Sequence, residues 1–250
     1  MGLRRTAAEA VNLLLRPLGA EVVAYDGGEK PWDREFAAWI SKAEASGRDP
    51  NDIGDAEWSD DPLRDVLARH YLPHMTRTST VLELGPGTGR LTRHLIGLCH
   101  DMVLVDYSQM ACAWLEHYLK SRGQFRVVHI TRPQLDGVDD ASIDMAVANG
   151  VFEHLDMDDV LYFLSEFRRV LRPGGRCSFN FNNAATNEGM ALFKRFRREV
   201  GSKCIFKFHH PETICRLAEA ALLQVDKLAT SSSRFAQIDL VNPFDVSAVT

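Results

Sequence analysis

From about residue 80 onward, short apolar runs alternate with longer segments in which apolar residues recur at helical spacing. The runs predict five strands, near residues 80–84, 102–106, 125–130, 143–148 and 176–181, and two closing strands near 224–229 and 234–241. The segments between them predict helices near 89–98, 108–121, 157–171 and 211–222. Strands that alternate with helices are typical of an α/β fold, in which helices cover both faces of a parallel sheet.

The first sixty residues lack this alternation. Residues 8–18 and 31–42 each predict an amphipathic helix, and in the second Phe36, Trp39 and Ile40 share one side. The residues that follow Ser59 are acids and a proline, which favour a helix start.

That third helix would carry Leu63, Val66, Leu67 and Tyr71 inward. We therefore expect two parts. Residues 1–60 form an N-terminal helical cap, and residues 61–250 form the main domain, which carries an insertion at 182–210 on the substrate side.

A glycine-rich turn follows the first predicted strand. The strand contains a single carboxylate, Glu83, and the turn contains Gly85, Gly87 and Gly89. A strand that enters a helix through such a turn presents backbone N–H groups and a helix N-terminus to a ligand. Glycine also permits positive φ and a close approach to the backbone. The turn therefore predicts a site for a cofactor that carries a nucleoside.

The glycine spacing distinguishes between two such cofactors. The dinucleotide fingerprint G-x-G-x-x-G requires a third glycine where this chain has Arg90. Asp106 ends the second predicted strand, twenty-one positions after Gly85, and this spacing suits a carboxylate that binds the ribose hydroxyls of either cofactor. The G-x-G-x-G spacing disfavours an NAD-dependent oxidoreductase.

The residues Glu-Leu-Gly-Pro-Gly-Thr-Gly at 83–89 resemble the first motif of class I S-adenosylmethionine-dependent methyltransferases of the small-molecule type. Segments 106–110, 143–155 and 167–176 resemble later motifs of this family, in the same order. The similarity spans residues 60–245. It implies a Rossmann-like, seven-stranded, mostly parallel sheet sandwiched by helices, with S-adenosyl-L-methionine as the cofactor and methyl transfer as the activity.

The resemblance also implies roles for individual residues. Glu83 helps to organise the site near the methionine amino group, and Asp106 binds the ribose. Tyr107 and Met110 flank the adenosine, and Asn149 faces the methionyl part. The three glycines of the turn complete the predicted cofactor site.

The chain departs from the family pattern after the third predicted strand. Many members have an acidic residue there that contacts the adenine. This chain has His129 and the following residues up to Gln134, with no carboxylate. We therefore expect the adenine amine to hydrogen-bond to backbone carbonyls, to Gln134 or to Asp136.

Candidate catalytic residues follow the strands, because the carboxyl ends of parallel strands meet at one crevice. A hydroxyl acceptor must lose a proton during methyl transfer, and a neutral imidazole near pH 7 can accept it. Glu153 and His154 follow the fourth predicted strand; alternatively, His154 caps the turn into the next helix. His210, which precedes a predicted helix, is a second candidate base, with an N-cap role as its alternative.

Quinone-biosynthesis O-methyltransferases and α-N-terminal protein methyltransferases carry a dipeptide similar to Glu153-His154. Asn182 and Asn183, at the end of the fifth predicted strand, can hydrogen-bond a polar substrate. The protein N-methyltransferases have an acid there instead. We therefore predict methyl transfer to a small-molecule acceptor, at a hydroxyl oxygen and with a histidine base. The alternatives are an amine or protein N-terminus as acceptor, or a non-catalytic cofactor-binding module.

Composition and charge disfavour several classes of protein. The chain has 250 residues, of which 45% are hydrophobic and 25% charged, which fits one globular domain with an extension. A net charge of −5 disfavours nucleic acid as a partner, and no apolar run approaches the ~18–20 residues of a membrane span. Five cysteines without a C-x-x-C pair predict reduced thiols in a cytoplasmic protein. No ligand spacing calls for a metal.

Overall fold

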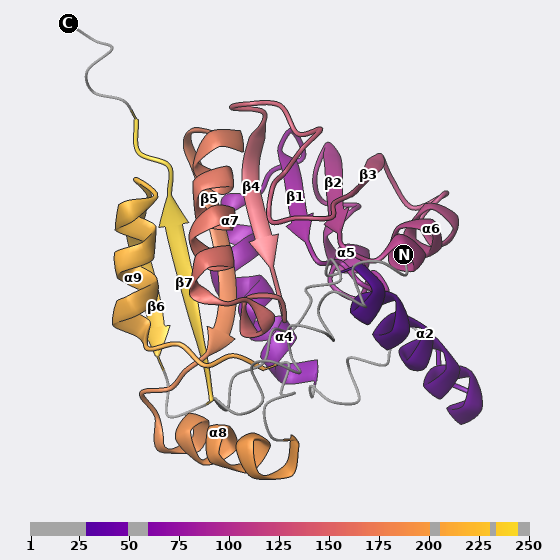
Figure 1. Ribbon diagram of the computed structural model, residues 1–250. Helices are drawn as coiled ribbons and strands as arrows, with labels where there is room; N and C mark the ends of the chain where they lie inside the picture. The colour runs from indigo at the N-terminus through magenta and orange to yellow at the C-terminus, as the bar shows by residue number, and fades with distance from the viewer. Residues whose placement is uncertain (1–28, 50–59, 201–205, 231–233, 245–250) are drawn as a thin grey trace, which may run out of the picture.

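The computed structural model describes residues 29–49, 60–200, 206–230 and 234–244. These residues form a seven-stranded sheet with the strand order β3-β2-β1-β4-β5-β7-β6 (Figure 1). Neighbours among the first five strands pair in parallel, whereas β7 is antiparallel to both β5 and β6. The sheet confirms the predicted α/β, Rossmann-like fold. The predicted helix at residues 8–18 lies outside the described residues.

The strands are β1 (Thr80–Leu84), β2 (Asp101–Asp106), β3 (Phe125–His129), β4 (Ile143–Ala148), β5 (Leu171–Asn182), β6 (Gln224–Thr230) and β7 (Phe235–Val241). The helices are α2 (Glu29–Ser46), α4 (Asp60–Val66), α5 (Thr92–Leu95), α6 (Gln109–Tyr118), α7 (Met157–Val170), α8 (Asn187–Val200) and α9 (Pro211–Ala220). Three short helices complete the described elements: η3 (Leu67–Tyr71), η4 (Leu72–His74) and η5 (Phe152–His154). All seven predicted strands are therefore present.

Two predicted boundaries are wrong. The helix expected at 89–98 begins only at Thr92, because Gly89 has a φ of 88° and a left-handed residue cannot begin a right-handed helix, and it ends at Leu95. The strand expected at 176–181 begins earlier, at Leu171, which pairs with Ile143. The register then shifts before Met145 pairs with Arg176, so the chain bulges between two paired segments.

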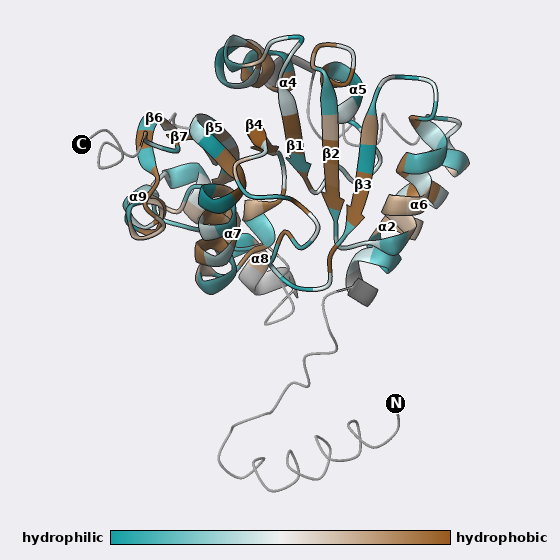
Figure 2. Cartoon of the chain, turned by 90° about the horizontal axis from the view of Figure 1, so that it is seen from above, coloured by the Kyte–Doolittle hydropathy of each residue, from teal (hydrophilic) through white to brown (hydrophobic). Residues whose placement is uncertain are grey.

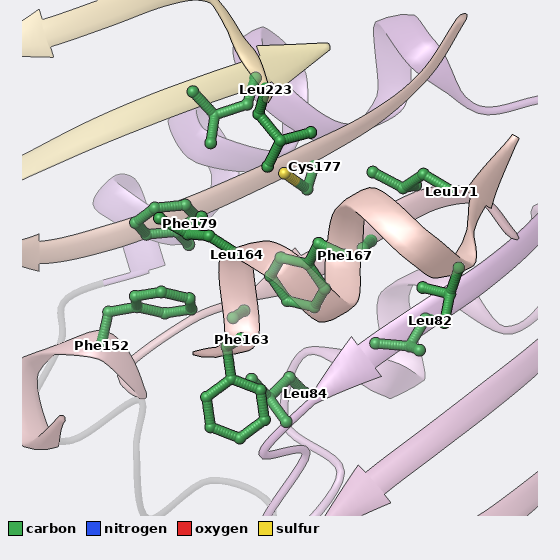
Figure 3. Packing of buried hydrophobic residues seen from close by; sticks show 14 of the residues in the cluster. Leu82, Leu84, Phe152, Phe163, Leu164, Phe167, Leu171, Cys177, Phe179 and Leu223 are labelled. Atoms are coloured by element: carbon green, nitrogen blue, oxygen red, sulfur yellow. The ribbon is translucent and has the colours of Figure 1, made fainter. Parts of the chain in front are cut away.

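Apolar clusters cover both faces of the sheet. On one face α7 and α9 pack on the strands, and on the other lie α4 and α5 (Figure 2). On the α7 face the ring of Phe152 stacks on that of Phe179, with 3.8 Å between centroids, and Phe163 and Phe167 of α7 lie beside them (Figure 3). Strands buried on both faces are nearly continuous apolar runs, which is the pattern that the sequence shows.

None of the described helices is long and apolar enough to cross a membrane. Cys99, Cys112, Cys177 and Cys215 are free thiols, and Cys204 lies outside the described residues. Burial raises the pKa of Cys99 to about 11 and that of Cys112 to about 12, which keeps both protonated and unreactive at neutral pH.

Candidate functional site

The glycine-rich turn connects β1 to α5 at the carboxyl edge of the sheet. Gly85, Gly87 and Gly89 have φ values of 68°, 55° and 88°, in the region that favours glycine. A Cβ atom at Gly85 would lie 2.4 Å from Cγ2 of Val151, so even alanine would force a rearrangement. The turn therefore needs glycine at the positions that the motif supplies.

Asp106 ends β2 beside this turn. Its carboxylate accepts hydrogen bonds from the backbone N–H groups of Gly87 (3.1 Å) and Ser108 (2.8 Å). Burial raises the pKa of Asp106, and the same backbone donors oppose the shift. A carboxylate has further acceptor capacity after two such bonds, so this position fits the two hydroxyls of a ribose.

Glu83 is buried within β1, on the face that carries α5. It accepts a hydrogen bond from Oγ1 of Thr92 at 2.8 Å. Burial raises its pKa to about 8; nearby Asp106 also raises the value, and Arg90 lowers it. A cationic ligand group beside Glu83 would restore the charged carboxylate, as an ammonium group does.

Tyr107 and Met110 border the end of β2. Tyr107 is partly buried against the core, whereas the Met110 side chain is 46% exposed and its backbone N–H donates to Oδ1 of Asp33 at 3.1 Å. Asp136, one candidate for the adenine contact, is ion-paired on the surface with Arg132 at 2.9 Å. This ion pair leaves Asp136 a weaker candidate.

Helix α2 covers this edge of the sheet. Oδ1 of Asp33 also accepts a hydrogen bond from Oγ of Ser108 at 2.7 Å, which fastens α2 to the first turn of α6. Cζ3 of Trp39 lies 3.8 Å from the place that a Cβ at Gly87 would occupy. The sequence predicted the helix but not Asp33, because an isolated acid on an amphipathic helix looks like an ordinary solvated residue.

Glu153 and His154 lie together in η5, directly after β4. Oε1 of Glu153 is 3.7 Å from Nε2 of His154. Oε2 of Glu153 is buried and, among the described residues, has no hydrogen-bond partner. Burial raises the pKa of Glu153 to about 7, and Arg234 and Arg90 lower it. The pair is thus a buried carboxyl group beside an imidazole.

Two aromatic rings enclose the imidazole of His154. The ring of Trp32, from α2, meets it edge-on at 4.9 Å between centroids, and that of Phe206 lies at 5.0 Å. These rings come from segments far apart in the sequence. Helix α2 and the segment between α8 and α9 therefore meet at His154.

His210 lies at the start of α9, where its Nδ1 accepts a hydrogen bond from the backbone N–H of Glu212 at 3.3 Å. The structure thus shows the capping role that the sequence left as an alternative, and a catalytic role for His210 stays a prediction. Asn182 is used locally: its Nδ2 donates to the carbonyl oxygen of Lys207 at 3.0 Å. His209 and His210 line a cavity of about 620 Å³ together with Phe193, Phe196 and Phe206.

Asn149 follows β4, and its buried Oδ1 makes no hydrogen bond of standard geometry among the described residues, although the buried Tyr71 side chain lies beside it. Four acceptor groups lie at or near the carboxyl ends of β1, β2 and β4, as the glycine turn does. They are the side-chain oxygens of Asn149 and Glu153, the carboxyl group of Glu83 and the carboxylate of Asp106. A ligand with an ammonium group and two ribose hydroxyls supplies the donors that these acceptors lack. The residues present therefore fit S-adenosylmethionine. The described residues contain no group of three or more His, Cys, Asp or Glu side chains arranged to hold a metal ion.

Comparison with known proteins gives a domain match and a fold. A methyltransferase domain model matches residues 82–179. A SAM-dependent methyltransferase from Methanosarcina mazei is 17% identical over 70% of this chain and 97% of its own, with a TM-score of 0.58. Magnesium protoporphyrin IX methyltransferase from Synechocystis PCC 6803, solved with bound SAH, is 16% identical over 76% and 84%, with a TM-score of 0.57.

The N-methyltransferase NodS from Bradyrhizobium japonicum WM9, in complex with S-adenosyl-L-homocysteine, is 17% identical over 73% of this chain and 86% of its own, with a TM-score of 0.56. At such identities the structural likeness establishes a shared fold, and the domain match adds the motifs within it. Residues 82–179 therefore match a methyltransferase domain, and the described chain has the fold of S-adenosylmethionine-dependent methyltransferases.

Proposed function

We propose that this enzyme transfers the methyl group to a hydroxyl oxygen of a small molecule, with His154 as the general base and Glu153 as its partner. The observation that carries the proposal is the buried Glu153 carboxyl group, 3.7 Å from the imidazole and with its second oxygen open. Such a pair is costly to bury unless a ligand or a proton transfer uses it.

The chemistry needs a base because a hydroxyl oxygen is a poor nucleophile while it holds its proton. When bound, the cofactor supplies an electrophilic methyl group. The imidazole of His154 accepts the hydroxyl proton, and the Glu153 carboxylate stabilises the imidazolium that forms. The rings of Trp32 and Phe206 fix the imidazole plane and restrict water around it.

The proposed cofactor contacts follow the same edge of the sheet. Asp106 binds the ribose hydroxyls, and Glu83 and Asn149 meet the amino-acid portion. Tyr107 and Met110 flank the adenosine. Gly85, Gly87 and Gly89 let the cofactor lie against the backbone of the turn.

An amine acceptor is the alternative, since an N-methyltransferase shares this fold. An amine that is already deprotonated in solution needs little help from a base. Loss of the base therefore separates the two acceptor classes: a hydroxyl acceptor depends on His154, and an amine does not.

The test is transfer of a tritiated methyl group from the cofactor to a panel of phenols, alcohols and amines. We expect a hydroxylated compound to be labelled and His154→Ala to lower kcat by about 100-fold or more, with unchanged affinity for S-adenosylhomocysteine. His100→Ala, an exposed histidine before β2, is the matched control. Full activity in His154→Ala, or loss of activity in His210→Ala alone, would refute the assignment of the base.

A further inference from the structure

A second cavity, of about 360 Å³, lies between the α4–η3 segment and the strands β4 to β7. Its apolar wall includes Leu63 and Val66 of α4 and Phe235 of β7. Its polar wall consists of three carboxamide side chains, those of Asn149, Asn180 and Gln237. This volume is within the range of small-molecule sites.

The three carboxamides each present an unused atom. Among the described residues, Oδ1 of Asn149, Nδ2 of Asn180 and Oε1 of Gln237 are buried and make no hydrogen bond of standard geometry. The buried hydroxyl of Tyr71 lies beside Asn149 and Gln237, but its single proton can satisfy only one of these two acceptors. Asn180 and Gln237 are only 4% and 7% exposed. Buried polar groups are normally satisfied, so a cluster with at least two open groups around one cavity indicates a ligand that completes them.

Neighbouring bonds fix which atom each side chain offers. The backbone N–H of Gly150 donates to Oδ1 of Asn180 at 2.8 Å, which leaves the Asn180 amide nitrogen as the free donor. Nε2 of Gln237 donates to Oγ of Ser178 at 2.8 Å, which leaves its carbonyl oxygen as the free acceptor.

A buried chain of polar groups holds Gln237 in this orientation. Nδ1 of His70 lies 3.0 and 2.8 Å from the two carboxylate oxygens of Asp239. The hydroxyl of Ser178 also binds Asp239. Because a carboxylate accepts only, Ser178 donates to it and must accept from Gln237. Asp239 therefore acts through Ser178 as a positioning residue for the Gln237 amide.

The cavity adjoins the proposed reaction site at two points. Asn149 belongs to both the cavity wall and the proposed cofactor site. Phe235 lines the cavity, and the guanidinium carbon of Arg234 lies 4.5 Å from its ring centroid. Arg234 is also close enough to Glu153 to lower the pKa of that carboxyl group. Gly150, which bonds to the cavity residue Asn180, also lies beside Glu153, because a Cβ atom there would be 3.9 Å from Oε1 of Glu153. The cavity thus borders the proposed cofactor site at Asn149 and lies close to Glu153.

We propose that this cavity is the acceptor pocket and that it binds a neutral molecule with two neighbouring hydroxyl groups on an apolar ring or chain. Each hydroxyl can donate to Asn149 or Gln237 and accept from Asn180. The cavity floor carries amides rather than charges. Its charged lining residues are Asp65 and Arg69, which pair with each other at 2.5 Å, and Lys227, which is exposed on β6. This inference rests on the proposed function and adds the location and chemistry of the acceptor.

The experiment measures binding to the protein saturated with S-adenosylhomocysteine, by calorimetry, with two probes of similar shape. Catechol is neutral and carries adjacent hydroxyls, and phthalate is a dianion. We expect catechol to bind and phthalate not to bind. Gln237→Leu should weaken catechol binding about tenfold, the effect of losing one buried hydrogen bond. Gln224→Leu, an exposed glutamine on β6, is the matched control.

Ser178→Ala is a second, milder variant that releases the Gln237 amide while keeping the packing. It should also weaken catechol binding and leave the affinity for S-adenosylhomocysteine unchanged. Preferred binding of phthalate, or catechol binding that neither variant changes, would overturn the inference. If neither variant changes the rate of methyl transfer to a hydroxyl, this inference is wrong, although the proposed function is still supported. Catechol binding that responds to both variants, without methyl transfer to any hydroxyl, would refute the proposed function but not the location of the pocket.

Discussion

A carboxyl group with a pKa of about 7 changes charge within the working range of most enzymes, and Glu153 is such a group. Below pH 7 it is protonated and cannot stabilise the His154 imidazolium. The rate constant kcat/KM should therefore rise with pH through the neutral range. Glu153→Gln should lower the rate and remove the part of the rise that belongs to this carboxyl group. A pH profile of both proteins measures this; identical profiles would contradict the role of Glu153.

Glu83 links protonation to stability. Burial raises its pKa in the folded protein to about 8, above the ordinary value that it has when unfolded. The folded state thus holds this proton more tightly, and the associated stability is present at low pH and is lost as pH rises from about 4.5 to 8. We expect the melting temperature of the cofactor-free protein to fall over this range. In Glu83→Gln the fall should be shallower, and thermal unfolding in a buffer series measures it. An equal fall in both proteins would show that Glu83 is not the group responsible.

At the scale of elements, α2 is held over the cofactor site by Asp33. This carboxylate accepts hydrogen bonds from Ser108 and Met110 at the start of α6, and Trp39 lies over the glycine turn. Asp33→Ala removes both bonds, so bound S-adenosylhomocysteine should dissociate about tenfold faster. Stopped-flow displacement measures this rate. Glu35→Ala, an exposed acid on the same helix, is the control, and equal rates in both variants would exclude a covering role for α2.

The sequence predicted some elements and site residues more completely than others. All seven strands were predicted, most directly the central strands β1, β2 and β4, because strands buried on both faces are continuous apolar runs. Apolar periodicity misplaced the start of α5, because the left-handed conformation of Gly89 is set by the turn and not by this pattern. The glycine turn and Asp106 are linked by fixed spacing within one strand–helix–strand unit, so a local motif was enough to find them.

The acceptor side could not be found this way, because its residues meet only through the sheet. Asn180 and Gln237 are cross-strand partners in β5 and β7, far apart in the sequence. The sequence pointed instead to Asn182 at the strand end, and the structure shows that residue bonded to the backbone of Lys207. Asp33 was missed for the same reason, since its partners lie 75 and 77 residues away.

For the whole molecule, cofactor binding should couple to global stability through Asp106, because the cofactor binds only the folded arrangement of β1, β2 and the glycine turn. A ligand present at about 100 times its Kd adds about 2.7 kcal/mol. In a chain of this size that corresponds to a rise in Tm of about 5 to 10 °C. Asp106→Ala should lose most of this rise, whereas Asp139→Ala, on an exposed loop, should keep it.

NADH should give no rise, because Arg90 stands where the dinucleotide fold needs glycine. Thermal unfolding with S-adenosylhomocysteine and with NADH measures all of these. An equal rise in Asp106→Ala, or a rise with NADH, would mean that the glycine turn holds its ligand in another way.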